Sequence, residues 1–176
     1  AARAEAVARR QRNLPMALAG KMGPAVLLMG FWGAVWLIWL AGVRDWRPQG
    51  SIALAWLGQV LLFMATAAIS ALLVAGAKRV GTALSLTAIY AGSALAFSGG
   101  TLPLNGASWL AVGWSAVLPY PHYLALAMDQ ALGSPPALAL RPGAVLLGYV
   151  LIAGGLACAL MAMARRPQPR PAPNTH

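Results

Sequence analysis

The chain has 176 residues, of which 60% are hydrophobic and 9% charged, and its thirteen basic and three acidic residues give a formal net charge of +10. A soluble domain carries about 25% charged residues, because its surface must stay hydrated. So few charges exclude a soluble globule, the high apolar content excludes a disordered chain, and the single cysteine excludes a disulfide scaffold. The composition indicates a membrane protein, whose outer surface faces lipid.

Four membrane-spanning helices are predicted. A spanning helix needs about 20 apolar residues, since each residue adds about 1.5 Å across a hydrocarbon core about 30 Å thick. The uncharged runs predict spans at about 24–43, 51–77, 80–97 and 144–164. The expected organisation is therefore a basic segment at 1–21, a transmembrane domain at 22–164 and a proline-rich tail at 165–176.

The region 98–133 separates the third and fourth predicted spans. Its apolar segment from Ala107 to Leu118 covers only about 18 Å, which is too short to cross the core. Glycine and proline bound this segment on both sides, so we expect a re-entrant or interfacial helical hairpin whose backbone is covered by protein. An ordinary extracellular loop of apolar composition is the alternative.

The distribution of lysine and arginine predicts the orientation. Ten basic residues lie before the first span, between the second and third spans, and after the fourth. The opposite side holds only Arg44, Arg47 and Arg141. Because cytoplasmic loops carry the excess of basic residues, both termini are expected in the cytoplasm and the protein in the cytoplasmic membrane.

The predicted spans contain no acidic, basic or histidine residue, so they lack the usual side chains of proton- or sodium-coupled transport. The polar side chains in these spans are uncharged and only weakly polar. Gln59, Thr66 and Ser70 form one helical stripe on the second span, and the third span carries Tyr90 and Ser93. Hydrogen bonding between helices is the simpler interpretation of these residues. The alternative is that all five line a transport pathway.

Enzymatic and cofactor chemistry finds little support in the sequence. Ser98 and His122 are the one pair that could serve an intramembrane hydrolase, but a histidine at the membrane interface is the simpler interpretation. Glu5, Asp45 and Asp129 lie too far apart in the sequence for a metal site, and no complete nucleotide-binding loop occurs. We expect no catalytic activity, no metal, no cofactor and no nucleic-acid partner.

Two motifs carry a family resemblance. The run Ala96-Phe-Ser-Gly-Gly-Thr-Leu-Pro-Leu104 and the later run Leu118-Pro-Tyr-Pro-His-Tyr-Leu124 flank a short apolar segment. In this order they resemble the permease subunits of type-2 ABC exporters. The N-terminal elements Arg3-Ala-Glu5, Leu14-Pro15 and Ala19-Gly-Lys21 are similar to the cytoplasmic loop of that family. The resemblance covers about residues 3 to 164. Since the family has six spans, it implies that this chain is the C-terminal part of a longer or divided permease.

The resemblance implies partners and site residues. It implies a separate cytoplasmic ATPase subunit, a second permease copy or half, and an amphipathic, drug-like or lipid-linked substrate. The candidate ATPase-docking residues are Glu5, Arg9, Arg10 and Arg12. The same segment could instead lie on anionic membrane lipid. The candidate residues of an external re-entrant gate are Ser98, Gly99, Gly100, Pro103, Pro119, His122 and Tyr123.

A function of another class also fits the sequence. Small residues such as Gly148, Gly154 and Gly155 allow close helix packing in any membrane protein. The chain could therefore be a multi-pass anchor or assembly subunit that transports nothing. A neighbouring gene for an ATPase with a nucleotide-binding loop would favour the exporter.

Overall fold

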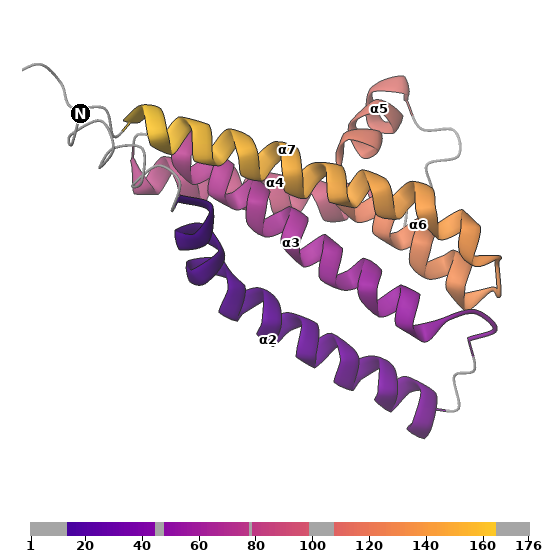
Figure 1. The fold of residues 1–176 in the computed structure, drawn as a ribbon. Coiled ribbons are helices and arrows are strands. Elements are labelled where there is room, and N and C mark those ends of the chain that lie inside the picture. Colours follow the sequence, from indigo (N-terminus) through magenta and orange to yellow (C-terminus); the bar gives the residue numbers. More distant parts are fainter. Residues whose placement is uncertain (1–13, 45–47, 78, 99–107, 165–176) are drawn as a thin grey trace, which may run out of the picture.

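The computed structural model describes residues 14–44, 48–77, 79–98 and 108–164. Within these ranges the chain forms helices and short connections and contains no strand (Figure 1). The helices are α2 (Leu14–Val43), α3 (Ile52–Gly76), α4 (Val80–Ala96), α5 (Trp109–Val117), α6 (Pro119–Ala131), the short 3₁₀ helix η1 (Pro136–Ala139) and α7 (Leu140–Ala164). The prediction of an all-helical chain is confirmed for the described residues.

Among the described residues, three helical stretches are long and apolar enough to cross a membrane: Leu14–Val43, Ile52–Gly76 and Pro136–Ala164. They contain three of the four predicted spans. The remaining predicted span, 80–97, is the third along the chain and corresponds to α4, which has only 17 residues and a length of about 25 Å. It ends where Phe97 and Ser98 leave the helical conformation.

Helix α3 lies at the centre of the bundle, and its most extensive contact is with the parallel helix α7 (Figure 1). Buried residues at steps of three and four form one stripe on α3, which includes Leu62, Ala65 and Ile69. The facing residues of α7 include Ala153 and Ala157. Small side chains let two helices approach closely, so the α3–α7 pair forms the core without large side chains at every position.

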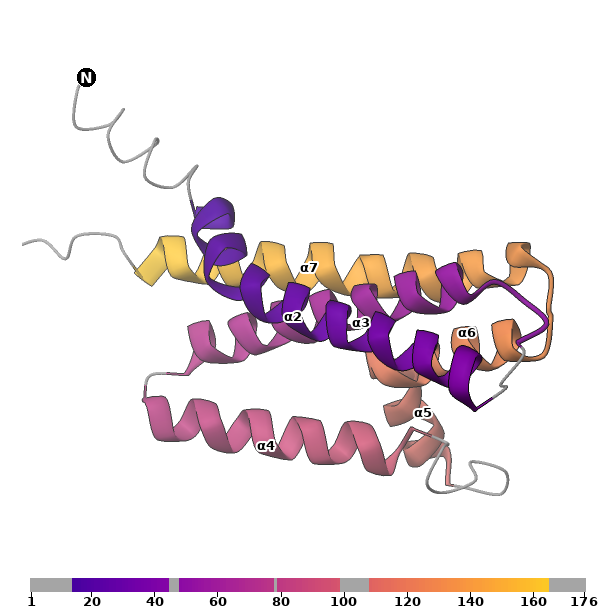
Figure 2. The same ribbon diagram turned by 90° about the horizontal axis from the view of Figure 1, so that it is seen from below.

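Helix α2 contacts the rest of the bundle along one narrow face. It starts at Leu14, inside the segment expected to precede the first span, and contains Pro24. Proline removes one backbone hydrogen bond and clashes with the preceding turn. The first turns accordingly lie at an angle to the remainder of α2 (Figure 2). Farther along, the indole Nε1 of Trp56 on α3 donates to the Gly30 carbonyl at 2.9 Å.

Helix α4 is the least embedded of the long helices. It lies beside the α3–α7 pair rather than within it (Figure 2), and Ala83 is its one buried residue. Leu84 and Ile89 are about 70% exposed. In water such surfaces would cause aggregation, whereas in a bilayer they face lipid or another protein.

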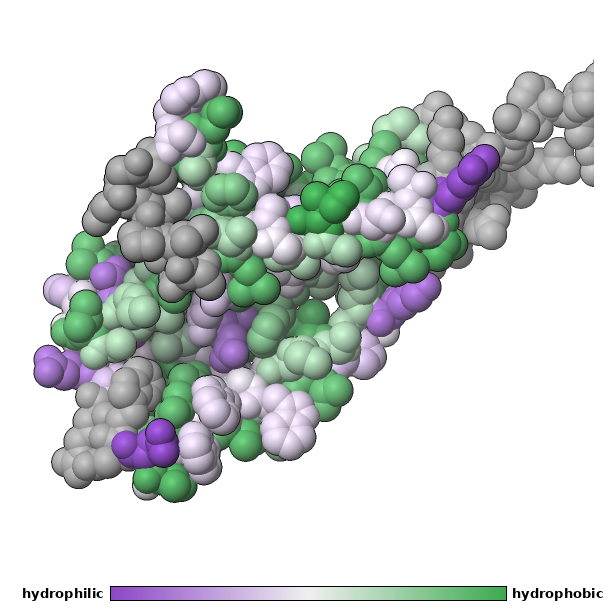
Figure 3. Space-filling model, turned by 180° about the vertical axis from the view of Figure 1, so that it is seen from behind, coloured by the Kyte–Doolittle hydropathy of each residue, from purple (hydrophilic) through white to green (hydrophobic). Residues whose placement is uncertain are grey.

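The outer surface of the bundle is largely apolar. Figure 3 shows one face on which hydrophobic residues predominate and hydrophilic residues gather mainly toward the two ends. On α2, Leu27, Phe31, Trp32 and Ile38 are each more than half exposed. This distribution is the inverse of a soluble protein and agrees with a membrane protein that has several spanning helices.

Candidate functional site

The candidate site is the α5–α6 hairpin, which occupies most of the region predicted to be re-entrant. Helix α5 begins at an N-cap, where the Ser108 hydroxyl accepts a hydrogen bond from the Ala111 backbone N–H at 3.4 Å. It ends at Leu118, because a residue that precedes proline is driven out of the helical region. Pro119 then starts α6, at the position where proline costs a helix nothing. The sequence Leu118-Pro119 therefore makes the elbow between two short helices.

This elbow is buried and hydrogen-bonded. Leu118 is 1% exposed, and Pro119 is among the most completely buried residues. The Tyr149 hydroxyl of α7 donates to the Val117 carbonyl, one of the groups that α5 leaves without a helical partner. The His122 Nε2 atom lies 3.0 Å from the Ala116 carbonyl, so this nitrogen carries the proton in that contact. Side chains thus supply the hydrogen bonds that water would supply at an exposed helix end.

The elbow lies partway along the bundle axis. Tyr149 follows Leu140, the first residue of α7, by nine positions, which corresponds to about 14 Å along the helix axis. The predicted span begins at about 144, so Tyr149 lies about 8 Å inside that boundary. Helix α6 runs from this depth back to the end of the bundle where α7 begins (Figure 1). Helix α5 leaves the elbow in a different direction, and Trp109 at its start is 80% exposed.

The far end of α6 is fastened to the chain that precedes α3. The Gly50 backbone N–H donates to the Gln130 carbonyl at 2.9 Å, and the Ser51 N–H donates to the Gln130 side-chain oxygen at 3.1 Å. Gln130 is 1% exposed, and its Nε2 atom is buried without a hydrogen-bond partner. We call Gly50, Ser51 and Gln130 the outer clasp. It joins the negative end of one helix dipole to the positive end of another.

A Schellman motif shapes the end of α6 at this clasp. Gly133 has a φ of +80°, which favours glycine. The backbone N–H groups of Ser134 and Gly133 donate to the carbonyls of Asp129 and Gln130, at 2.8 and 3.4 Å. These bonds satisfy carbonyls at the helix end and direct the chain toward η1 and α7.

The middle of α6 packs against a glycine of α3. A methyl group added at Gly58 would lie 2.9 Å from a Cδ atom of Leu126, so the leucine fills the space that the missing side chain leaves. Leu126 is 3% exposed. Helix α6 is therefore held at three levels, by the elbow, by Leu126 and by the outer clasp.

The residues predicted for the gate lie partly in this hairpin. Pro119 is at the elbow, and His122 and Tyr123 follow it on the first turn of α6. Ser98 is 4% exposed at the end of α4, where its hydroxyl donates to the Leu95 carbonyl at 2.8 Å. Gly99, Gly100 and Pro103 lie outside the described residues, as do the docking candidates Glu5, Arg9, Arg10 and Arg12.

The residues predicted to line a pathway do not all face one space. Gln59 faces α2, because a methyl group added at Gly33 would lie 2.5 Å from its Oε1 atom. The Thr66 hydroxyl donates to the Leu62 and Phe63 carbonyls, and the Ser93 hydroxyl to the Tyr90 carbonyl, all within their own helices. Such bonds satisfy the hydroxyls locally and do not join helices.

Three of these side chains, those of Gln59, Ser70 and Tyr90, make no hydrogen bond to another helix within the described residues. The Gln59 Oε1 and the Tyr90 hydroxyl are buried without a partner, and Ser70 on α3 is partly buried. Buried polar groups are almost always paired. Gln59 and Tyr90 therefore stay candidates for contact with something the chain itself does not supply.

The sequence did not predict the residues whose hydrogen bonds fix α6 in place. Gln130 and Ser51 are 79 positions apart, and Tyr149 and Val117 are 32 apart. No local pattern reports pairings over such distances. The usable signal was polarity: Tyr149 is an isolated polar residue in apolar surroundings, and Asp129-Gln130 is a polar pair between apolar residues.

The described residues contain no group of three or more His, Cys, Asp and Glu side chains that could hold a metal ion. Comparison of the sequence and structure with protein families, characterised proteins and solved structures finds no match. The function must therefore be argued from the geometry and the sequence.

Proposed function

We propose that this chain is the membrane-spanning permease component of an ATP-driven ABC exporter. In this proposal α2, α3, α4 and α7 each cross the cytoplasmic membrane, and both termini are cytoplasmic. The ten-to-three distribution of basic residues supports this orientation. Helix α4, with 17 residues, is at the lower limit of length for a spanning helix.

The observation that carries the proposal is the buried elbow between α5 and α6. Membrane helices that stop halfway are tolerated only where protein or a water-filled cavity covers their free backbone groups. In transporters, such discontinuous helices place exposed helix ends near the middle of the membrane, where substrates bind. In this proposal the Tyr149 and His122 side chains cover the free backbone groups of such an interrupted helix.

The energy would come from a partner. The predicted spans lack charged residues, so no ion gradient has an evident coupling group. A separate ATPase would dock on the segment that contains Glu5, Arg9, Arg10 and Arg12, and a second permease copy or half would complete the pathway. Because the spans carry uncharged, weakly polar side chains, the proposed substrate is amphipathic, drug-like or lipid-linked.

The α5–α6 hairpin would act as the external gate. ATP-driven closure of the partner would tilt the spanning helices, and α6 would move as one body when the outer clasp opens. The clasp is suited to this role because it consists of two hydrogen bonds from the Gly50 and Ser51 backbone, each at or beyond 2.9 Å. Its rupture would release the C-terminal end of α6 without breaking any helix, while the elbow and Leu126 still hold the rest of α6.

The docking proposal is tested by charge reversal at Arg9 and Arg10. Where a neighbouring gene encodes an ATPase with a nucleotide-binding loop, the full chain is co-expressed with that ATPase, and co-purification and export are measured. We expect R9E/R10E to lose both, since like charges would replace an attractive contact. The matched control is Arg165→Glu with Arg166→Glu, which reverses two charges at the other terminus and should leave the complex intact. Full co-purification of the Arg9/Arg10 variant, together with absence of ATP-dependent export by the wild type, would favour the anchor function.

A further inference from the structure

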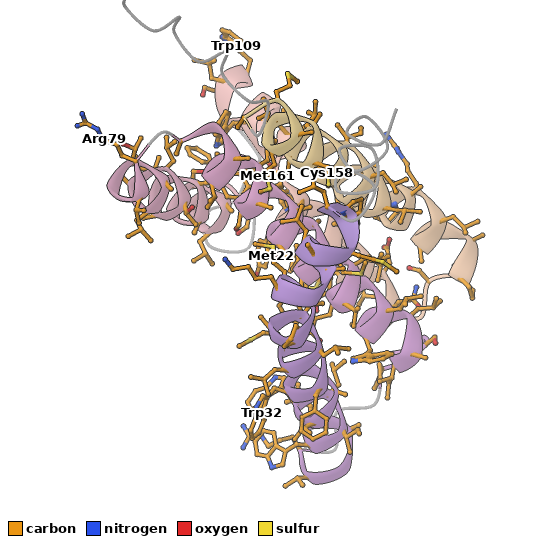
Figure 4. All side chains as sticks on the ribbon, turned by 60° about the vertical axis from the view of Figure 1, so that its left-hand side comes forward. Met22, Trp32, Arg79, Trp109, Cys158 and Met161 are labelled. Atoms are coloured by element: carbon orange, nitrogen blue, oxygen red, sulfur yellow. The ribbon has the colours of Figure 1, made fainter. Side chains whose placement is uncertain are left out.

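A second feature, apart from the hairpin, is an apolar groove between α2, α3 and α7. It has a volume of about 680 Å³. Its lining includes Met22 and Leu27 of α2, Met64 and Ala68 of α3, and Leu151 and Cys158 of α7. Figure 4 shows Met22 and Cys158 in the same part of the bundle, toward the ends of α2 and α7 that carry the termini, while Trp32 lies farther along α2. We call this cavity the inner groove.

The dimensions of the inner groove match one lipid chain. On α3 the lining runs from Val60 to Ala71, which is about 16 Å of helix. One leaflet of the hydrocarbon core is about 15 Å thick. An acyl chain is thin enough to fit.

The chemistry of the lining agrees with such an occupant. Every lining residue is apolar, and several are glycine or alanine, so the walls offer contact area without a hydrogen-bonding group. Glycines at 23 and 155 have no atom within 4 Å of an added methyl group. The groove is therefore open space next to lipid rather than a tightly packed seam between helices.

A positive charge lies beside the groove. Pro24 divides α2 so that residues 24–43, about 30 Å of helix, suffice to cross the core. Lys21 lies just before that stretch, is exposed, and lies in the sequence between the lining residues Ala19 and Met22. A basic residue near a membrane surface attracts anionic lipid headgroups.

We propose that the inner groove binds an acyl chain of an anionic phospholipid, with its phosphate beside Lys21. The inference does not depend on the proposed export function, since a lipid site of this kind would serve an anchor subunit equally well. It assigns a ligand to the gap between α2 and α7, where the two helices themselves make little contact.

Photo-crosslinking tests the proposal. The full chain is reconstituted in phosphatidylcholine vesicles with a trace of phosphatidylglycerol that carries a photoreactive group within one acyl chain. We expect the crosslinks to concentrate on groove residues such as Met22, Ala68 and Cys158. The Lys21→Gln variant should reduce the preference for phosphatidylglycerol over an equally labelled phosphatidylcholine by about fivefold, the effect of one charge near a membrane surface.

Filling the groove provides the matched pair of variants. Gly155→Leu places a side chain in the groove, whereas Gly148→Leu lies two turns earlier on the same helix, outside the lining and likewise in open space. Only the first should abolish the groove crosslinks. If Gly155→Leu fails to fold, Gly23→Leu fills the groove from α2.

Three results would overturn the proposal. The first is equal labelling by the two lipids, and the second is labelling spread evenly over exposed residues such as Phe31 and Trp32. The third is efficient Cys158-to-Cys158 crosslinking of two copies by a short bismaleimide, which would show that a second chain occupies the groove. Cys158 is the single cysteine of the sequence, so this measurement needs no engineered residue.

Discussion

At the residue scale, glycines decide how closely the elements approach. At Gly50 an added methyl group would lie 2.4 Å from the Gln130 carbonyl oxygen and 3.0 Å from its Cα atom. Both are backbone atoms, which cannot rotate away as a side chain can. Gly58 differs, because the atom it would meet is the end of the flexible Leu126 side chain. The outer clasp is therefore the less tolerant of the two contacts.

The Gly50→Ala variant should loosen the clasp. The methyl group must push the α6 end away, which is an overpacking change that costs about 1–3 kcal/mol. We expect a lower thermal unfolding temperature in detergent and faster hydrogen exchange in residues 126–131. The control is Gly148→Ala, where an added methyl group meets no atom within 4 Å. An unchanged exchange rate in Gly50→Ala would contradict the clasp geometry.

At the element scale, short and long helices differ in the hydrogen bonds that stabilise them. Helix α7 has 25 residues and keeps nearly all its backbone bonds internally. Helix α5 has only 9 residues, so the groups left unpaired at its ends form a large share of its backbone. Ser108, Tyr149 and His122 supply partners for these groups. The stability of α5 therefore depends on side chains from other elements.

The Tyr149→Phe variant should destabilise the elbow selectively. Removing the hydroxyl leaves the Val117 carbonyl without this donor, and one hydrogen bond contributes about 0.5–1.5 kcal/mol. We expect hydrogen exchange in α5 to rise by about threefold to tenfold. The comparison is Thr87→Val, which removes a hydroxyl that donates to Ala83 within α4. Equal effects of both substitutions on α5 would argue against a specific role of Tyr149.

Sequence best predicts the helices whose bounds are set by the length of an uncharged apolar run. The span at 51–77 matches α3, because a long uncharged run has few other arrangements in a bilayer. The break before Pro119 was also predictable from local sterics. The start of α2 was not, since Pro15 and Lys21 look like interruptions although a helix tolerates both near its N-terminus. The clasp and the inner groove arise from tertiary packing and have no local pattern.

At the scale of the whole molecule, the described helices differ in how deeply they are buried. Helix α3 is surrounded by α2, α4, α6 and α7. Helices α2 and α4 lie at the periphery and leave broad apolar faces uncovered (Figure 2). In a membrane such faces meet lipid or another protein. The orientation of the bundle in the membrane decides which compartment each end faces.

Cysteine labelling tests this orientation. In a Cys158→Ala background, single cysteines replace Gly20, Ser134 or Arg170, and intact cells are treated with a membrane-impermeant maleimide. We expect Ser134→Cys to react from outside and the other two only after permeabilisation, because the basic residues favour cytoplasmic termini. Reaction of positions 20 and 170 from opposite sides would refute a topology with an even number of crossings.

The central pairing of α3 with α7 has a consequence for biosynthesis. Ribosomes complete α3 long before α7, and the two helices are separated by 63 residues that include α4, α5 and α6. Until the last helix enters the bilayer, the alanine-rich stripe of α3 lacks α7, the helix with which α3 makes its most extensive contact. A nascent chain must therefore be kept from premature association or quality-control degradation over the entire interval, and any stop codon before residue 140 would leave that stripe permanently unmatched.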